Sequence, residues 1–206
     1  MTQICIPINE KDPQNFRSAF RSALKSADII EVWLDELKEI GQETLTLLNK
    51  SKKPILYKVT AKKPKVSLKD FSPHYIDFDL KTPAKILKAY KGPQLIISHH
   101  DFKKTPSDKA LAKLIAKMDK FKPDIYKLAT SAKDFSDSLR MLQLLNQLQL
   151  DGKQAICICM GSAGRITRAA GHLLGNYLMF APQDEQKATA PGQLTLKELR
   201  AIYNLI

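Results

Sequence analysis

The sequence has few of the features that mark membrane-spanning, secreted or disulfide-linked proteins. No apolar run approaches the roughly 20 residues that a membrane-spanning helix needs. The first residues lack the basic segment and apolar segment of a secretory leader. The chain has three cysteines, and Cys157 and Cys159 are too close in sequence to form a plausible bridge or to supply a zinc quartet. We therefore expect a cytoplasmic protein with no membrane partner and no bound metal.

Arginine is also scarce, although the chain carries a net charge of +12. Only six of its 33 basic residues are arginines, and the lysines are spread along the chain. Nucleic-acid sites usually combine clustered basic residues with aromatic side chains. The charge therefore indicates a lysine-rich solvated surface, and we expect no nucleic-acid partner. With 44% hydrophobic and 26% charged residues, the composition is typical of a globular protein, and we expect one domain over residues 1–206.

Short β-branched runs alternate with segments of helical periodicity. The runs predict eight strands, over residues 4–8, 29–35, 54–60, 75–80, 95–102, 124–129, 155–160 and 177–181. The segments between and after them predict seven helices, over residues 13–26, 36–50, 83–91, 107–120, 133–150, 164–175 and 195–205. Such alternation is typical of a parallel sheet with helical crossovers, and eight units predict a (β/α)8, or TIM, barrel.

The predicted barrel is a trimmed one. TIM barrels typically contain about 250 residues, and this chain has 206. Residues 61–74, between the third and fourth predicted strands, include two prolines and leave room for a turn of helix at best. We therefore expect the third helix of this α/β fold to be shortened or absent.

Alternation within the strands predicts which side chains face the inside of the barrel. In the strand over 29–35 the residues of one parity are apolar, which leaves Glu31, Trp33 and Asp35 inside. The following strands add charged groups to the same inner face: Lys58, Asp77, Asp79, His100 and Lys127. Buried charges are costly unless they are paired, so this convergence indicates a functional site. For the three aspartates, ion pairs that hold the barrel layers together are an equally good interpretation.

Two of the inner residues suit chemistry on a carbonyl compound. A lysine among apolar neighbours and other cations has a lowered pKa, so Lys127 would be partly the neutral amine that Schiff-base formation requires. His100 titrates near neutrality and suits proton transfer, whereas His99 points the opposite way and is expected to be satisfied locally. After the strand over 155–160, glycines and arginines between Gly161 and Arg168 predict a site for a phosphate or a carboxylate.

Taken together, these segments resemble type I 3-dehydroquinate dehydratase, the class that works through a Schiff base. The resemblance covers nearly the whole chain, and the order and spacing of its motifs argue against chance. The motifs are Ser98-His99-His100-Asp101-Phe102 with Thr105-Pro106, then Asp124-Ile125-Tyr126-Lys127, then residues 160–168, then Ala190-Pro191-Gly192-Gln193.

The resemblance implies a lyase that dehydrates 3-dehydroquinate to 3-dehydroshikimate in the shikimate pathway, on the way to chorismate and the aromatic amino acids. It implies no cofactor and suggests a homodimer. Lys127 would form the Schiff base with the C3 ketone, and His100 would remove a C2 proton and return one to the departing C1 hydroxyl. Arg168 would grip the substrate carboxylate, and further substrate contacts would come from Glu31, Trp33, Lys58, Thr189 and Gln193.

The chain departs from the family pattern at one wall of the pocket. The family's arginine two residues after Glu31 is Trp33, and the arginine of its third strand is Lys58. Its acidic residue that supports the histidine is Lys62, and the serine that ends its first strand is Pro7. Two alternatives therefore stay open. One is a Schiff-base lyase or aldolase of the same fold that acts on a related keto acid, and the other is a non-catalytic homologue.

Overall fold

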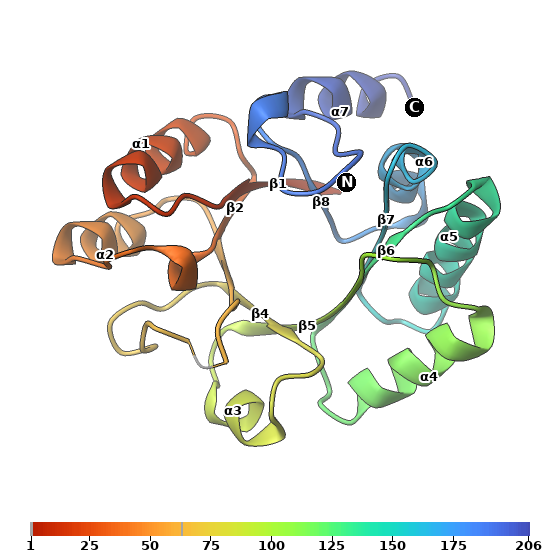
Figure 1. The fold of residues 1–206 in the computed structure, drawn as a ribbon, viewed down its shortest axis with the longest axis horizontal. Helices are drawn as coiled ribbons and strands as arrows, with labels where there is room; N and C mark the ends of the chain where they lie inside the picture. Colours follow the sequence, from red (N-terminus) through yellow and green to blue (C-terminus); the bar gives the residue numbers. More distant parts are fainter. Residues whose placement is uncertain (1, 63) are drawn as a thin grey trace.

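Eight parallel strands form one sheet that curls into a barrel, with the helices on its outside (Figure 1). The structure is a computed structural model that describes residues 2–62 and 64–206, apart from the side chains of Lys88 and Ala89. The strands are β1 (Gln3–Ile8), β2 (Ile29–Val32), β3 (Ile55–Lys58), β4 (Tyr75–Asp79), β5 (Gln94–Asp101), β6 (Ile125–Ser131), β7 (Ala155–Met160) and β8 (Leu178–Phe180). The predicted (β/α)8 barrel is confirmed.

The helices follow the strands in alternation, as predicted. They are α1 (Pro13–Ala23), α2 (Gln42–Asn49), α3 (Ala84–Ala89), α4 (Asp108–Asp119), α5 (Phe135–Leu150), α6 (Arg165–Ala170) and α7 (Leu196–Tyr203). Side chains fix several of their starts: Asp12 accepts hydrogen bonds from the first turn of α1, and Thr195 and Glu198 form a capping box on α7. No helix in the described part of the chain is long and apolar enough to cross a membrane.

The sheet runs in the order β7-β6-β5-β4-β3-β2-β1-β8, and its two ends meet through Asn176. The Asn176 side chain accepts a hydrogen bond from Cys157 N at 2.8 Å and donates one to Leu178 O at 2.6 Å. Beside it, Tyr177 N donates to Ala155 O at 2.8 Å. A buried amide thus links β7 to the segment that enters β8, and the barrel is nearly closed.

The connection from β3 to β4 contains no helix among its described residues, which confirms the predicted trimming (Figure 1). The buried carboxylate of Asp35 organises this connection instead. It accepts hydrogen bonds from the backbone N–H groups of Thr60 at 2.9 Å, Ala61 at 3.2 Å and Lys65 at 2.9 Å. The prediction that Asp35 faces the inside of the barrel is therefore wrong. The reason is that β2 ends at Val32 and the chain turns into a 3-10 helix over Leu34–Glu36, which breaks the strand alternation.

Candidate active site

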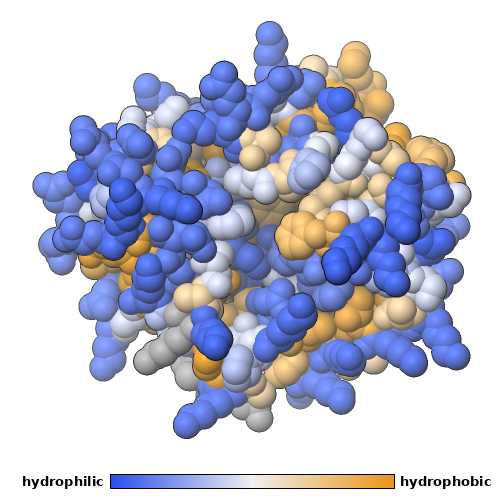
Figure 2. All heavy atoms as spheres, viewed as in Figure 1, coloured by the Kyte–Doolittle hydropathy of each residue, from blue (hydrophilic) through white to orange (hydrophobic). Residues whose placement is uncertain are grey.

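A cavity of about 370 Å³ lies at the carboxyl ends of the strands and is closed on one side by the loop that follows β8. This is the end of the barrel at which TIM-barrel enzymes place their sites. The surface is hollowed near the centre of the view in Figure 2, and both hydrophilic and hydrophobic side chains border the hollow. All eight site residues named from the sequence line this cavity: Glu31, Trp33, Lys58, His100, Lys127, Arg168, Thr189 and Gln193.

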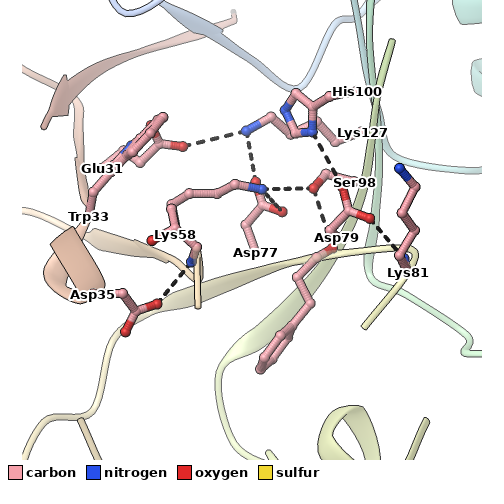
Figure 3. Close-up of polar contacts among 12 residues, drawn as sticks. Glu31, Trp33, Asp35, Lys58, Asp77, Asp79, Lys81, Ser98, His100 and Lys127 are labelled. Atoms are coloured by element: carbon pink, nitrogen blue, oxygen red, sulfur yellow. Dashed lines mark hydrogen bonds and ion pairs between the residues drawn. The ribbon is translucent and has the colours of Figure 1, made fainter. Parts of the chain in front are cut away.

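Lys127 lies at the centre of a buried network of charges (Figure 3). Its Nζ is 2.8 Å from Oδ2 of Asp77 and 3.4 Å from Oε1 of Glu31. The same Asp77 carboxylate is 3.0 Å from Nζ of Lys58 through its other oxygen. The Phe180 ring lies 4.1 Å below the Lys127 ammonium, in cation–π geometry. Two lysines therefore share one aspartate, and a glutamate balances the remaining charge.

This arrangement overturns the expected charge state of Lys127. Burial by itself would lower the pKa of the amine, but the Asp77 and Glu31 carboxylates outweigh burial and raise the pKa above its usual value. The sequence-based prediction of a lowered pKa is therefore wrong, because it supposed apolar neighbours and other cations. In the free protein Lys127 is an ammonium ion.

The lowered pKa belongs to Lys58 instead. Burial lowers the pKa of Lys58, its contact with Asp77 only partly offsets this, and the nearby charge of Lys127 lowers it further. Burial alone would raise the pKa of the Asp77 carboxyl, but Lys127 and Lys58 hold it well below its usual range. Asp77 is fully buried and is ionised at neutral pH, so it serves as the common counter-ion of both lysines.

His100 and Lys127 come from neighbouring strands and face the same cavity. In the β5–β6 ladder, Ser98 pairs with Lys127 and His100 pairs with Ala129. His100 therefore lies two residues closer than Lys127 to the carboxyl ends of the strands, on the same inner face. Burial lowers the pKa of His100, which leaves the ring neutral at neutral pH and able to accept a proton. His99 does not line the cavity, as strand alternation predicts.

The indole of Trp33 supports Glu31. Its Nε1–H donates to Oε2 of Glu31 at 2.8 Å, while the other oxygen of that carboxylate faces Lys127 (Figure 3). The single donor of the indole is thus already used within the protein. Trp33 contributes a fixed carboxylate and an apolar wall to the cavity.

Arg168, in the last turn of α6, supplies the cavity with a buried cation. Its side chain is 2% exposed, and among the described residues nothing accepts a hydrogen bond from its Nε. Burial lowers the pKa of Arg168 to about 10, so the guanidinium stays charged at neutral pH. A buried guanidinium with a free donor is suited to bind a carboxylate of a ligand.

The loop after β8 carries the last two predicted residues. Gln193 folds back and accepts hydrogen bonds from Thr189 N at 2.7 Å and Ala190 N at 3.2 Å. This loop is fastened to the loop after β7, because Gly161 N donates to Pro191 O at 3.1 Å. These hydrogen bonds stabilise the loop, and they place the side chains of Thr189 and Gln193 at the cavity.

Several residues at the cavity were not named as site residues from the sequence. Asp79 lines the cavity and Asp77 contacts its two lysines, but both were placed on the inner face without a role at the site. Phe102 was named only as part of a motif, and Phe180 and Lys81 were not predicted. Extending the alternation argument to β7 and β8 would have found Ile158, Met160 and Phe180. Phe102 and Lys81 lie just beyond the ends of β5 and β4, where alternation no longer predicts direction.

The chain is similar over nearly its whole length to proteins of one family. The family model of type I 3-dehydroquinase matches residues 4–206. The 3-dehydroquinate dehydratase of Methanococcus maripaludis strain C5 is 34% identical over 223 residues, which cover 98% of this chain and 99% of that protein. The bifunctional 3-dehydroquinate dehydratase/shikimate dehydrogenase of Arabidopsis thaliana is 30% identical over 86% of this chain and 32% of that protein. The crystal structure of 3-dehydroquinate dehydratase from Geobacillus kaustophilus HTA426 superposes with a TM-score of 0.84 at 23% identity, over 100% of this chain and 91% of that chain, and so shares the fold.

Proposed function

The chain belongs to the type I 3-dehydroquinase family, and we propose that Lys127 and His100 carry out the family's reaction in it. That reaction is the dehydration of 3-dehydroquinate to 3-dehydroshikimate in the shikimate pathway, so the protein is a hydro-lyase that works through a Schiff base. The observation that carries the assignment of residues is the pairing of Lys127 with Asp77 and Glu31 on the wall that also presents His100.

The charge network suits a reaction whose intermediate is a cation on nitrogen. Lys127 passes a proton to solvent or to a neighbouring carboxylate, and the neutral amine attacks the C3 carbonyl. Loss of water from the adduct gives an iminium ion, which restores the positive charge that Asp77 and Glu31 already face. The two carboxylates that raise the pKa of the lysine therefore also stabilise the iminium, because a site that is complementary to the charged state lowers the energy of that state.

His100 then moves the protons. The iminium withdraws electrons from C2, and the neutral imidazole removes a C2 proton. The imidazolium returns a proton to the C1 hydroxyl, which leaves as water as the C1–C2 double bond forms. Water then hydrolyses the iminium, which releases 3-dehydroshikimate and frees the Lys127 amine. The pKa of His100, lowered by burial, keeps the base form available at neutral pH.

Substrate binding falls to the remaining cavity residues. Arg168 takes the carboxylate of 3-dehydroquinate, and Glu31, Lys58, Thr189 and Gln193 contact its oxygens.

We also propose that residues 1–206 form one domain, since strands from Gln3 to Phe180 share one sheet. A homodimer and a cytoplasmic location, which the family resemblance suggests, belong to the same proposal.

The test uses 3-dehydroquinate itself. We expect the protein to generate the absorbance of the conjugated enone product, and borohydride added during turnover to leave a covalent adduct on Lys127 that intact-mass analysis and peptide mapping detect. Lys127→Ala is expected to reduce dehydration to background. Lys153→Ala is the control and should keep the activity, because Lys153 is half-buried in an ion pair with Asp119 and does not line the cavity. Dehydration that continues without an adduct would remove the Schiff-base role of Lys127.

A further inference from the structure

The imidazole of His100 faces the carboxylate of Asp79, which takes no part in the steps of the proposed reaction. Nδ1 of His100 lies 3.9 Å from Oδ2 of Asp79, at the end of β4 (Figure 3). The other oxygen, Oδ1, accepts a hydrogen bond from Lys81 N at 2.8 Å. The backbone turn after β4 therefore fixes the carboxylate, and the oxygen that it leaves free points at the histidine.

The other charged groups near His100 form ion pairs with one another. They are Lys58 on β3, Asp77 on β4 and Lys127 on β6. Both oxygens of Asp77 contact lysines, at 3.0 Å and 2.8 Å, whereas the two lysines can only repel an imidazolium. Lys62, at the position where the family resemblance places an acid, is exposed and cannot accept a proton from the ring. Asp79 is thus the carboxylate that is available to the imidazole.

We propose that Asp79 is the positioning residue for His100: its carboxylate holds the proton of the ring on Nδ1 and leaves Nε2 free to take a proton from the substrate. The inference rests on the proposed function. A partner on one ring nitrogen fixes both the tautomer and the orientation of an imidazole. The 3.9 Å separation is longer than a hydrogen bond, and such contacts tighten when substrate fills the site and the ring acquires charge.

The test is the pair Asp79→Asn and Asp79→Glu. The asparagine side chain still accepts from Lys81 N, so the turn is preserved while the charge is removed. We expect Asp79→Asn to form the borohydride-trapped adduct on Lys127 but to lose about 10- to 1000-fold in kcat, up to the range that a general acid–base contributes. Asp79→Glu is expected to recover most of kcat.

The pH dependence separates positioning from packing. A carboxylate raises the pKa of a neighbouring imidazole, so its removal lowers the pKa of His100, and the acidic limb of the kcat profile should move to lower pH. The same shift should appear when the His100 ring is titrated by NMR in the protein without substrate. The NMR titration does not require activity on 3-dehydroquinate, so it tests the role of Asp79 separately from the proposed function. A titration curve of His100 that is unchanged in Asp79→Asn would overturn the inference, whether or not kcat falls.

Discussion

The charge of Lys127 depends on two residues that are distant in sequence but close in space. Glu31 is 96 positions and Asp77 50 positions distant in sequence, yet both lie within 3.4 Å of the amine. Their carboxylates keep Lys127 protonated in the free protein, and loss of that proton is part of the cost of the first chemical step. The same carboxylates offset this cost, because they stabilise the iminium that replaces the ammonium.

The two adjacent histidines are expected to respond very differently to removal. His100→Ala should still form the imine, because condensation needs only the amine, but kcat should fall by about 10²–10⁴-fold, because elimination needs a proton carrier. His99→Ala is the matched control and should have a mild effect, since its ring does not line the cavity. Steady-state rates and borohydride trapping of both variants make the comparison. Equal losses in both would show that the alternation assigned to β5 does not describe the working site.

Trp33 is expected to determine how tightly the pocket holds its substrate. Trp33→Arg supplies donors for substrate oxygens as well as for Glu31, and a charge-assisted hydrogen bond contributes about 1.5–3 kcal/mol, or roughly 10–150-fold in affinity. We therefore expect KM for 3-dehydroquinate to fall while kcat stays similar, which is the mark of uniform binding. Trp33→Phe, which removes the bond to Glu31 and keeps a smaller aromatic ring in the wall, should instead lower kcat/KM by about tenfold.

A different outcome for Trp33→Arg would change the interpretation of this wall. If the folded variant lost its activity, the indole would itself be a working part of the site. A pocket built around tryptophan would then favour the alternative substrate, a related keto acid. Comparing the unfolding temperature of the variants with that of the parent protein shows whether the loss reflects folding.

At the scale of elements, two loops act together at the mouth of the barrel. Gly192 has a φ of +74°, and a Cβ placed on it would lie 2.4 Å from Gly161 O. The loop after β8 can therefore approach the loop after β7 only with glycine at this position. The result is that Thr189 and Gln193 are held at the cavity.

Gly192→Ala is expected to push the loop after β8 away from the cavity. Misplacement of binding groups by about 1 Å can cost up to about 100-fold, so we expect kcat/KM to fall by about 10- to 100-fold. Gly152→Ala is the control, because that glycine has a similar φ of +70° but open space around it. It should lose about 1–3 kcal/mol of stability from backbone strain and keep its KM. An unchanged KM in Gly192→Ala would show that the loop does not position the substrate.

The connection from β3 to β4 shows how a barrel can lose a helix. Asp35 satisfies three backbone N–H groups of the connection. These groups would otherwise lack partners where the loop folds against the barrel. One carboxylate thus orders a segment that in a full-length unit would be held by a helix, and this places Lys58 at the end of β3 beside Asp77.

For the whole molecule, Asp77 links the inside of the barrel across β3, β4 and β6. Asp77→Asn leaves two buried ammonium groups with less compensation, and breaking a buried ion pair in this way costs about 3–5 kcal/mol. We therefore expect a clear loss in the free energy of unfolding at neutral pH, measured by urea titration. The conservative shape of asparagine makes the charge, rather than volume, the variable that changes.

The effect of Asp77 is expected to depend on pH in a defined direction. Its pKa in the folded protein lies below that in the unfolded chain, so its stabilisation is fully present above the unfolded value of about 4 and is lost as pH falls through the folded one. The stability difference between the parent protein and Asp77→Asn should therefore be constant from pH 7 to pH 5 and shrink below about pH 4. A difference that grows in acid would contradict the assignment of Asp77 as the ionised counter-ion.

Local patterns in the sequence determined the barrel and the inward direction of several residues that line its cavity. The period of two in strands and of 3.6 in helices is a property of neighbouring residues, so the eight strands, their inner faces and the missing helix were all predictable. Lys127 and His100 could be placed on one face for the same reason. The eight residues named for the site all line the cavity, but Arg168, Thr189 and Gln193 were named from the family resemblance and not from alternation.

The tertiary structure alone decided the charge states and the partners within that cavity. Alternation predicts which way a side chain points but not which atoms meet it. The Glu31 and Asp77 neighbours of Lys127, the indole donor on Glu31 and the Asp79 carboxylate beside His100 therefore appeared only once the strands were in register. Asp35 was misplaced because a strand end depends on packing with β3, which a local pattern does not contain. Electrostatic energy depends on distances between residues remote in sequence, and the closure of the barrel sets those distances.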